Sequence, residues 1–421
     1  MFMDQKDFVA DKLAEFFFSR FFDDWKNLSA QQLSDFLKPK AEQVITFEEL
    51  EKKIASGRKL RIKFGIDPTG PDVHLGHLLP VMLLRQFQKA GHQIHLIIGD
   101  FTAMIGDPSG RNEQRPALNE KEVKKNSKTY FSQIGKYLDV GKTKKHRNSK
   151  WLKKLSFRKI LEDLRRLNLS EVLQREDFRN RIKEGQSLTI AELLYSYAQA
   201  IDSVETEADV EVGGRDQLLN FAHARTIMQM KGLKPEVALT TPVLEGIFGD
   251  GKKMSKSYGN YIAVNSSLED KFGKIMSMPD SLLMMYYKAF TDVKESELGK
   301  LKYLVDSNPL ETKKQLAQFI VSIETQSLEA GKKEREKFEN RFSKGVYDEE
   351  IPELNFKEGQ FLVDVLMSSG QFKSKSELLR LFEQNAIKSV EPEERFFARD
   401  EIAVEGTYKV GKTKFFRFKI K

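Results

Sequence analysis

Two histidines and a threonine are the first residues in the chain whose types and spacing could do chemistry. They lie in the stretch Phe64 to Leu78, which reads F-G-I-D-P-T-G-P-D-V-H-L-G-H-L. His74 and His77 would share one face of a helix, and Gly76 lets a flat ligand approach the backbone. Because a helix N-terminus favours anions, these residues and the Thr69 hydroxyl predict a phosphate clamp. Two ordinary capping histidines are the alternative.

A phenol, an amide and a carboxylate follow at helical spacing. Tyr195, Gln199 and Asp202 are separated by four and three residues, which puts them on one helical face among apolar neighbours. Tyr195 and Gln199 could hold an amino group, and Asp202 could accept a hydrogen bond from a hydroxyl. The same face could instead be a buried polar network that only fixes helix packing.

Two further aspartates lie in glycine-containing turns. Asp107, in I-G-D-P-S-G, could bind an ammonium group, although aspartate is also a common turn residue. Asp216, in E-V-G-G-R-D-Q, could take both hydroxyls of a ribose, and the glycines before it allow close backbone approach.

Lysines dominate a later loop, which reads K-K-M-S-K-S-Y-G-N from Lys252 to Asn260. Lysine ammonium groups on such a loop could close on a triphosphate and neutralise charge that builds on a leaving pyrophosphate. As an isolated string, however, a basic loop with serines is common.

These residues need a sheet to bring them together. The pattern predicts a strand at 59–66, a helix from His74 and a second strand at 92–98, which form a β-α-β unit of a parallel sheet. Ligands of such sheets bind outside the carboxyl ends of the strands. We therefore predict that the motifs meet at one edge of a Rossmann-type α/β domain.

Composition sets wider limits. The 421 residues predict two or three domains, and the net charge of +8 suits a polyanionic partner. The chain has no cysteine, which excludes disulfides and thiolate metal sites. No run of 18 apolar residues occurs, so we expect no membrane span and a cytoplasmic protein. The lysine-rich stretch 142–150 is read as solvated surface or as an RNA contact.

The motifs together resemble a known family. H-L-G-H followed by K-M-S-K-S resembles the class I aminoacyl-tRNA synthetases. D-P-T-x-P-D-x-H-L-G-H, I-G-D-P-S-G, Y-x-x-x-Q-x-x-D and G-G-x-D-Q look like the bacterial tyrosyl-tRNA synthetases, over residues 40–340 and more weakly beyond. The resemblance implies that tyrosine is activated with ATP and then transferred to tRNA(Tyr). A non-catalytic RNA-binding paralogue and a tryptophanyl-type enzyme are the alternatives.

The resemblance also implies a role for each motif residue. The catalytic group would hold the ATP phosphates and comprises His74, His77, Thr69, Lys253 and Lys256. The ATP-binding group comprises Asp67, Gly76, Gly214, Asp216 and again Lys256. The tyrosine-binding group comprises Gly65, Asp107, Tyr195, Gln199, Asp202 and Gln217, with Asp202 accepting the phenolic hydroxyl. ATP is expected as a substrate with Mg²⁺, without a bound organic cofactor or a metal site of the protein's own.

Domains and assembly follow from the same resemblance. The expected units are an N-terminal helical segment (1–55), the catalytic domain (56–262), a helical anticodon-region domain (263–330), a linker (331–355) and a small α+β RNA-binding domain (356–421). A homodimer is implied. The alternation of basic and aromatic residues in 411–421 suggests RNA phosphate contacts with base stacking, or else an ordinary edge strand with lysines.

Five positions depart from the family pattern. Lys63 and Phe64 stand where many tyrosyl enzymes have Tyr-Cys, which removes one expected partner of the substrate hydroxyl and leaves its recognition to Asp202. Ile201 and Arg215 stand where an aromatic and a small hydroxyl residue are more usual, and Ala103 replaces a frequent glycine. Arg215 is expected to alter nucleotide affinity.

Overall fold

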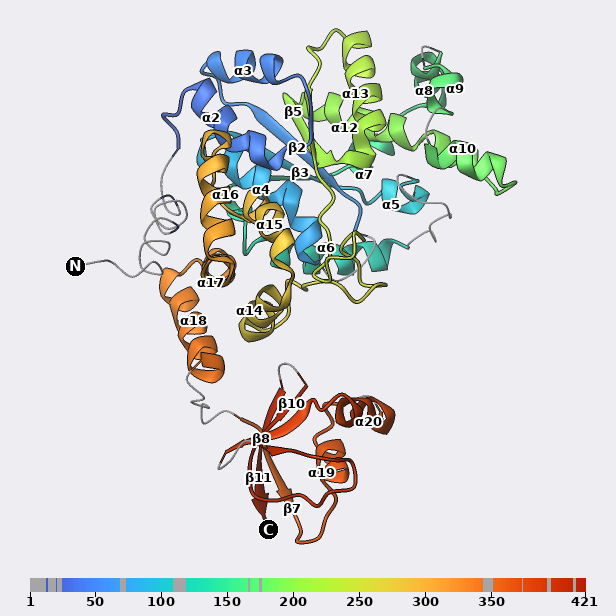
Figure 1. Cartoon of the computed structure of the whole chain (residues 1–421). Helices are drawn as coiled ribbons and strands as arrows, with labels where there is room; N and C mark the ends of the chain where they lie inside the picture. Colours follow the sequence, from blue (N-terminus) through green and yellow to red (C-terminus); the bar gives the residue numbers. More distant parts are fainter. Residues whose placement is uncertain are drawn as a thin grey trace, which may run out of the picture. The chain divides into compact units, whose positions relative to one another are not determined.

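A six-stranded sheet organises the first part of the chain (Figure 1). The computed structural model describes Leu13, Arg20 and residues 25–68, 73–108, 119–165, 167–173, 176–343, 351–372, 374–391, 395–411 and 414–421. The strand order is β1-β6-β5-β2-β3-β4. All neighbouring strands are parallel except β1, which pairs antiparallel with β6. The predicted Rossmann-type α/β fold is confirmed.

The strands are β1 (Gln43–Ile45), β2 (Arg61–Ile66), β3 (Gln93–Ile98), β4 (Lys144–Arg147), β5 (Val210–Gly214) and β6 (Val237–Thr241). The helices of this region are α2 (Ala30–Leu37), α3 (Phe47–Ala55), α4 (Leu75–Lys89), α5 (Thr102–Ile105), α6 (Glu120–Ile134), α7 (Ser149–Leu152), α8 (Phe157–Leu164), α9 (Leu169–Val172), α10 (Glu176–Lys183), α11 (Ile190–Leu193), α12 (Tyr195–Thr206) and α13 (Leu218–Met230).

The order of the strands reverses at β2. The chain passes from β2 to β3 and β4 on one side, whereas β5 and β6 lie on the other. The pairing of β2 with β5 covers two steps, Ile62 with Val210 and Lys63 with Glu211. By contrast, β2 and β3 pair over six residues. An opening therefore forms where β2 and β5 separate, which is the place where doubly wound sheets bind ligands.

Two strands were not predicted. Residues 1–55 were expected to be helical, but Gln43–Ile45 form an edge strand; Val44 and Ile45 are β-branched and find a partner in β6. The lysine-rich stretch 142–150 contains β4, which pairs with β3. The side chains of β4 are nonetheless mostly exposed, which agrees with the predicted solvated surface; the strand itself was missed because its hydrogen-bonded partner is distant in the sequence. Most of the first 24 residues of the predicted N-terminal helical segment lie outside the described residues.

Five helices follow the sheet: α14 (Leu268–Ser277), α15 (Leu283–Phe290), α16 (Leu298–Ser307), α17 (Pro309–Thr325) and α18 (Leu328–Ser343). The sequence predicts helices where α15 to α18 lie, and it gives no separate helix for α14 within the predicted helical region. A buried cluster ties α14 and α17 to the sheet domain. Lys136 and Lys271 both pair with Glu324, at 2.8 and 2.7 Å, and both donate to the Val264 carbonyl.

Residues 333–421 form a second compact unit. Its elements are β7 (Glu353–Phe356), α19 (Leu362–Ser368), α20 (Lys375–Glu383), β8 (Ile387–Glu391), β9 (Arg395–Phe396), β10 (Gly406–Val410) and β11 (Lys414–Ile420), with sheet order β7-β11-β10-β8-β9. The predicted linker (331–355) contains most of α18 and of β7, and the domain boundaries themselves stay predictions.

The last strand of this unit corrects both readings of its sequence. Phe415, Phe416 and Phe418 are buried in the core of the unit, so these rings are not available to stack on RNA bases. The strand is also not at an edge, because β11 lies between β7 and β10. Lys414 and Lys419 alternate with the rings and are partly or fully exposed.

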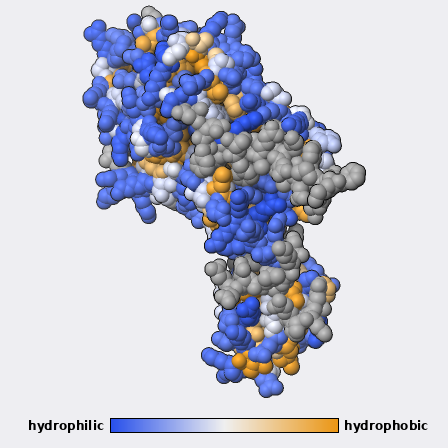
Figure 2. Space-filling model, turned by 90° about the vertical axis from the view of Figure 1, so that its left-hand side faces the viewer, coloured by the Kyte–Doolittle hydropathy of each residue, from blue (hydrophilic) through white to orange (hydrophobic). Residues whose placement is uncertain are grey.

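The surface agrees with the charged composition. Figure 2 shows a face that is largely hydrophilic in both units, with small separate apolar areas. Within the described part of the chain, the helices are too short or too polar to span a bilayer.

Candidate active site

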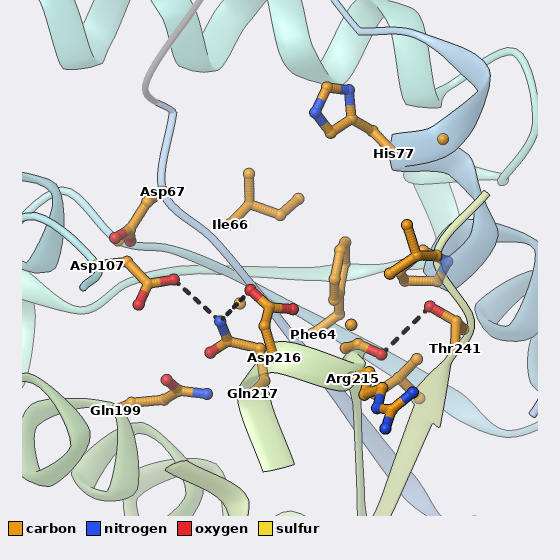
Figure 3. Close-up of a pocket in the computed structure, with 18 of the residues that line it drawn as sticks. Phe64, Ile66, Asp67, His77, Asp107, Gln199, Arg215, Asp216, Gln217 and Thr241 are labelled. Atoms are coloured by element: carbon orange, nitrogen blue, oxygen red, sulfur yellow. Dashed lines mark hydrogen bonds between the residues drawn. The ribbon is translucent and has the colours of Figure 1, made fainter. Parts of the chain in front are cut away.

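A cavity of about 600 Å³ opens at the carboxyl ends of β2 and β5. It brings together nearly all of the predicted site residues, which come from six separate segments of the chain. They are Gly65, Asp67, His74, Gly76, His77, Asp107, Tyr195, Gln199, Asp202, Gly214, Asp216, Gln217, Lys253 and Lys256. Thr69 is the exception, because it lies outside the described residues. In Figure 3, Asp67, Asp107 and Gln199 lie on one side of the pocket and His77 lies on the other.

The two histidines begin helix α4. His74 has extended backbone angles and precedes the first turn, and its backbone N–H donates to Nδ1 of His77 at 3.2 Å. Their rings lie 3.8 Å apart between centroids. A Cβ on Gly76 would come within 3.0 Å of the His74 ring, so only glycine fits between them. The predicted helix start and shared face are therefore present.

Both imidazoles are neutral at pH 7. Burial, followed by the nearby charges of His77 and Lys256, lowers the pKa of His74 to about 3. Enclosure in the cleft and the charge of Lys256 lower the pKa of His77 as well. Nδ1 of His74 is buried and has no hydrogen-bond partner among the described residues. The histidines can thus act as neutral hydrogen-bonding groups beside a cationic loop.

The lysine loop is held at two points. Met254 is buried and its sulfur accepts from the N–H of Gly76 at 3.3 Å, which fastens the loop to the start of α4. Asn260 is fully buried and bonds to Ser255 and Lys253 of the same loop. Lys253 and Lys256 are exposed. The anchors hold the loop at the cleft, where both lysines line the cavity.

The amino-acid side of the pocket contains a continuous chain of hydrogen bonds. Tyr195 donates its hydroxyl to Asp67 at 2.8 Å, and Thr102 donates to the other oxygen of Asp67 at 2.7 Å. Asn148 donates to Thr102 at 3.0 Å and to Asp202 at 3.3 Å. Asp67 was predicted to bind ATP, but these contacts group it with Tyr195 and Asp202.

A second chain starts at Asp107. Gln217 donates to Asp107 at 3.0 Å, and Asn220 donates to the Gln217 carbonyl at 2.9 Å. Asn220 also donates to the carbonyl oxygen of Gln199 at 3.0 Å, and the Gln199 amide donates to Glu211 at 3.1 Å. Each amide therefore has a fixed orientation.

Asp202 lies at the closed end of the pocket. Its carboxylate is 4 % exposed and accepts from the indole N–H of Trp151 at 2.7 Å as well as from Asn148. Burial raises the pKa of Asp202 to about 7, against the opposing charge of Lys63 and the two hydrogen bonds. A hydroxyl that donates to this carboxylate would replace part of the lost hydration.

Gly214 and Asp216 lie close together. A Cβ on Gly214 would approach an Asp216 oxygen to 2.5 Å, so a larger residue there would displace the Asp216 carboxylate. Gln217 donates to Asp216 at 3.2 Å. Arg215 turns away from this group and pairs with Glu42 at 3.0 Å.

Five residues of this hydrogen-bond network were missed by the sequence reasoning: Thr102, Asn148, Trp151, Glu211 and Asn220. Asn148 lies near the end of the lysine-rich stretch and Trp151 follows it directly, so an amide and an aromatic ring at a strand end could have been a signal. Of the departures from the family pattern, Ile201 lies in the core beside α13, and Ala103 is buried in α5. Lys63 lies beneath the pocket, against Glu211.

The fold and this arrangement of histidines and lysines define a class I aminoacyl-tRNA synthetase. A family model described as "tRNA synthetases class I (W and Y)" matches residues 55–343. The chain is 41% identical over 387 residues to the tyrosine–tRNA ligase of Thermotoga maritima, covering 90% of this chain and 96% of that one. It is 42% identical to tyrosine–tRNA ligase 2 of Vibrio parahaemolyticus, over 91% and 98% of the two chains. This chain therefore belongs to the bacterial tyrosine–tRNA ligase family.

Solved structures agree at the level of the fold. A truncated mitochondrial tyrosyl-tRNA synthetase of Aspergillus nidulans superimposes with a TM-score of 0.60 at 21% identity, over 80% of this chain and 100% of that one. The tyrosyl-tRNA synthetase of Archaeoglobus fulgidus, solved with L-tyrosine, superimposes with a TM-score of 0.58 at 24% identity, over 73% of this chain and 100% of that one.

Proposed function

We propose that this chain attaches L-tyrosine to tRNA(Tyr) in two steps. The tyrosine carboxylate attacks the α-phosphate of ATP, which gives tyrosyl-adenylate and releases pyrophosphate. The terminal ribose hydroxyl of the tRNA then attacks the adenylate carbonyl and releases AMP. The observation that carries the proposal is a single pocket with a buried carboxylate, Asp202, at its closed end and the His74, His77 and Lys256 groups at its phosphate end.

Position and charge supply the catalysis in this proposal. Lys253 and Lys256 neutralise the leaving pyrophosphate, and the neutral histidines donate hydrogen bonds to phosphate oxygens. Thr69 takes the phosphate role that the family resemblance implies. Gly76 leaves room for the nucleotide, and Gly214 and Asp216 bind the ribose.

The other end of the pocket selects the amino acid. Asp107, Tyr195 and Gln199 hold the ammonium group, and Gln217 lies near the substrate carboxylate. Gly65 leaves space for the substrate because no atom lies within 4 Å of a Cβ placed there. Asp202 accepts the phenolic hydroxyl. Phenylalanine would leave the buried Asp202 group without its partner, which is unfavourable.

ATP enters with Mg²⁺ in this proposal. The described part of the chain has no cluster of three or more side chains suited to a metal ion, so the proposal assigns Mg²⁺ no protein ligands. The reaction takes place in the cytoplasm, where a bacterial tRNA pool is found. The C-terminal unit contacts the tRNA backbone through the lysines and arginine of its last residues, 411–421.

The proposed homodimer would use an apolar surface on the helices between β4 and α12. Five large apolar side chains are between about half and three-quarters exposed there: Phe157, Leu161, Leu169, Ile182 and Ile190. Sedimentation of the purified protein measures its oligomeric state directly. A monomer at micromolar concentration would contradict the dimer and leave the reaction untouched.

Amino-acid-dependent exchange of pyrophosphate into ATP tests the reaction. We expect exchange with L-tyrosine, and none with L-tryptophan or without an amino acid. Exchange with tryptophan would favour the tryptophanyl-type alternative. Absence of exchange with every amino acid, in a folded protein that binds RNA, would favour the non-catalytic paralogue.

A further inference from the structure

Lys63 is a fully buried lysine directly beneath the amino-acid pocket. Its ammonium group contacts three acceptors: Glu211 Oε1 at 2.8 Å, Ser203 Oγ at 2.7 Å and the backbone carbonyl of Gln199 at 3.1 Å. A lysine ammonium has three N–H donors. All three are therefore used, and none remains for the hydroxyl of a substrate.

The charges of this cluster are balanced. Burial disfavours the Lys63 ammonium, but Glu211 and Glu236 outweigh burial and raise its pKa. Burial works against the Glu211 carboxylate too, yet Lys63 lowers its pKa overall. Burial and then Glu211 raise the pKa of Glu236, which is thus a neutral acid. Lys63 and Glu211 therefore form the ion pair of this cluster, and an ionised Glu211 can only accept hydrogen bonds.

An acceptor at this place fixes the orientation of Gln199. The Gln199 amide nitrogen donates to Glu211, and its carbonyl oxygen faces Asn220, which is a donor. Turned by 180°, the amide would direct its oxygen at a carboxylate and its nitrogen at another amide nitrogen. Both contacts would be lost, so the carboxylate selects one orientation.

We propose that Lys63 and Glu211 are positioning residues for the ammonium group of the substrate. The pair holds the Gln199 amide so that its carbonyl oxygen, which has a second lone pair beyond the one that Asn220 uses, faces the pocket and accepts from the ammonium. Lys63 keeps Glu211 ionised, and Glu211 keeps the Gln199 nitrogen away from a cation that it would repel. The inference rests on the proposed function, which assigns Gln199 to the ammonium group.

Three ligands separate this role from general support of the fold. L-tyrosine and tyramine carry an ammonium group, whereas 3-(4-hydroxyphenyl)propanoate lacks it and keeps the phenol. Dissociation constants are measured by titration calorimetry on the full chain. For Glu211→Gln we expect tyrosine and tyramine to bind roughly tenfold more weakly, the size of one hydrogen bond to a charged group. The dissociation constant of the propanoate should change by less than about twofold, within the usual effect of a distant substitution.

Two further variants make the result decisive. Lys63→Met combined with Glu211→Gln leaves no unpaired buried charge and should give the same pattern if the single variant does not fold. Glu236→Gln exchanges a neutral acid for a neutral amide and should leave the dissociation constants of all three ligands unchanged. Equal weakening of all three ligands in the Glu211 variants, or no weakening, would overturn the inference. Failure of the unaltered chain to bind tyrosine would instead overturn the proposed function.

Discussion

Lys63 and Glu211 face each other across β2 and β5 at the last paired step before these strands separate, and their side chains form a buried ion pair of 2.8 Å. The ion pair thus lies at the floor of the opening that contains the pocket. Truncation of one partner of such a pair costs about 3–5 kcal/mol, because it leaves an uncompensated buried charge. The Lys63–Glu211 ion pair consequently contributes both to the geometry of the site and to the stability of the sheet.

Replacement of Lys256 by alanine should slow pyrophosphate exchange by roughly 10²–10³-fold, the usual loss for one charge-stabilising group in a transition state. The Kd for tyrosine should change little, because Lys256 lies at the phosphate end. Lys252→Ala is the matched control: Lys252 is exposed on the same loop but pairs with Asp250 at 3.2 Å. Equal losses in both variants would mean that the loop requires net charge rather than Lys256.

Trp151→Phe should reduce the preference for tyrosine over phenylalanine. The substitution removes the N–H that donates to Asp202 at 2.7 Å and keeps an aromatic ring. A hydrogen bond to a charged group is worth roughly 1.5–3 kcal/mol, so the ratio of kcat/KM values should fall by about 10- to 100-fold. Tyr197→Phe is the control, since Tyr197 donates to Asp163 outside the pocket. An unchanged ratio in the Trp151 variant would argue that Asp202 needs no support from the indole.

Tyrosine affinity should depend on pH because burial raises the pKa of Asp202 to about 7. A phenol that donates to this carboxylate binds its ionised form. The Kd for tyrosine should therefore fall as the pH rises through about 7. Below pH 7, the Kd should increase by up to about tenfold for each pH unit. Phenylalanine lacks the hydroxyl and should bind without this trend. Calorimetric titrations between pH 5.5 and 8.5 measure the Kd values for both amino acids. The Asp202→Asn variant should bind tyrosine with a Kd that does not depend on pH. A Kd independent of pH in the unaltered chain would contradict the prediction.

Removal of the residues after Ser343 should separate the two reaction steps. The C-terminal unit has its own sheet and its own core, with Leu362, Leu366, Phe382, Tyr408 and Phe416 buried in it. Pyrophosphate exchange should therefore persist, while transfer to tRNA(Tyr) should fall at least tenfold and lose part of its salt dependence. Loss of exchange as well would mean that this unit supports the catalytic fold.

Sequence patterns predicted the catalytic sheet well and its edges poorly. The buried strands β2, β3, β5 and β6 have strong apolar runs, and the motif residues follow them directly. The outer strands β1 and β4 have short or polar sequences, and their structure comes from pairing with a neighbour. Local periodicity contains no information about that neighbour.

The same reason explains which parts of the site were missed. Gln199, Asp202 and Asp107 belong to motifs with recognisable spacing. Asn148 and Trp151 reach Asp202 from 54 and 51 residues away in the chain. Glu211 begins the motif E-V-G-G-R-D-Q, but it acquires its role from Lys63 on a non-consecutive strand. Only the folded sheet reveals such pairs.

The ion pair beneath the pocket also restricts how this family can diverge. A single change at Lys63 or Glu211 passes through a form with an unpaired buried charge, at a cost of about 3–5 kcal/mol. Typical proteins have only about 5–15 kcal/mol of stability to lose. Lineages that carry a phenol in place of Lys63 should therefore also carry an uncharged residue in place of Glu211, and descent from one form to the other should require both changes at nearly the same time.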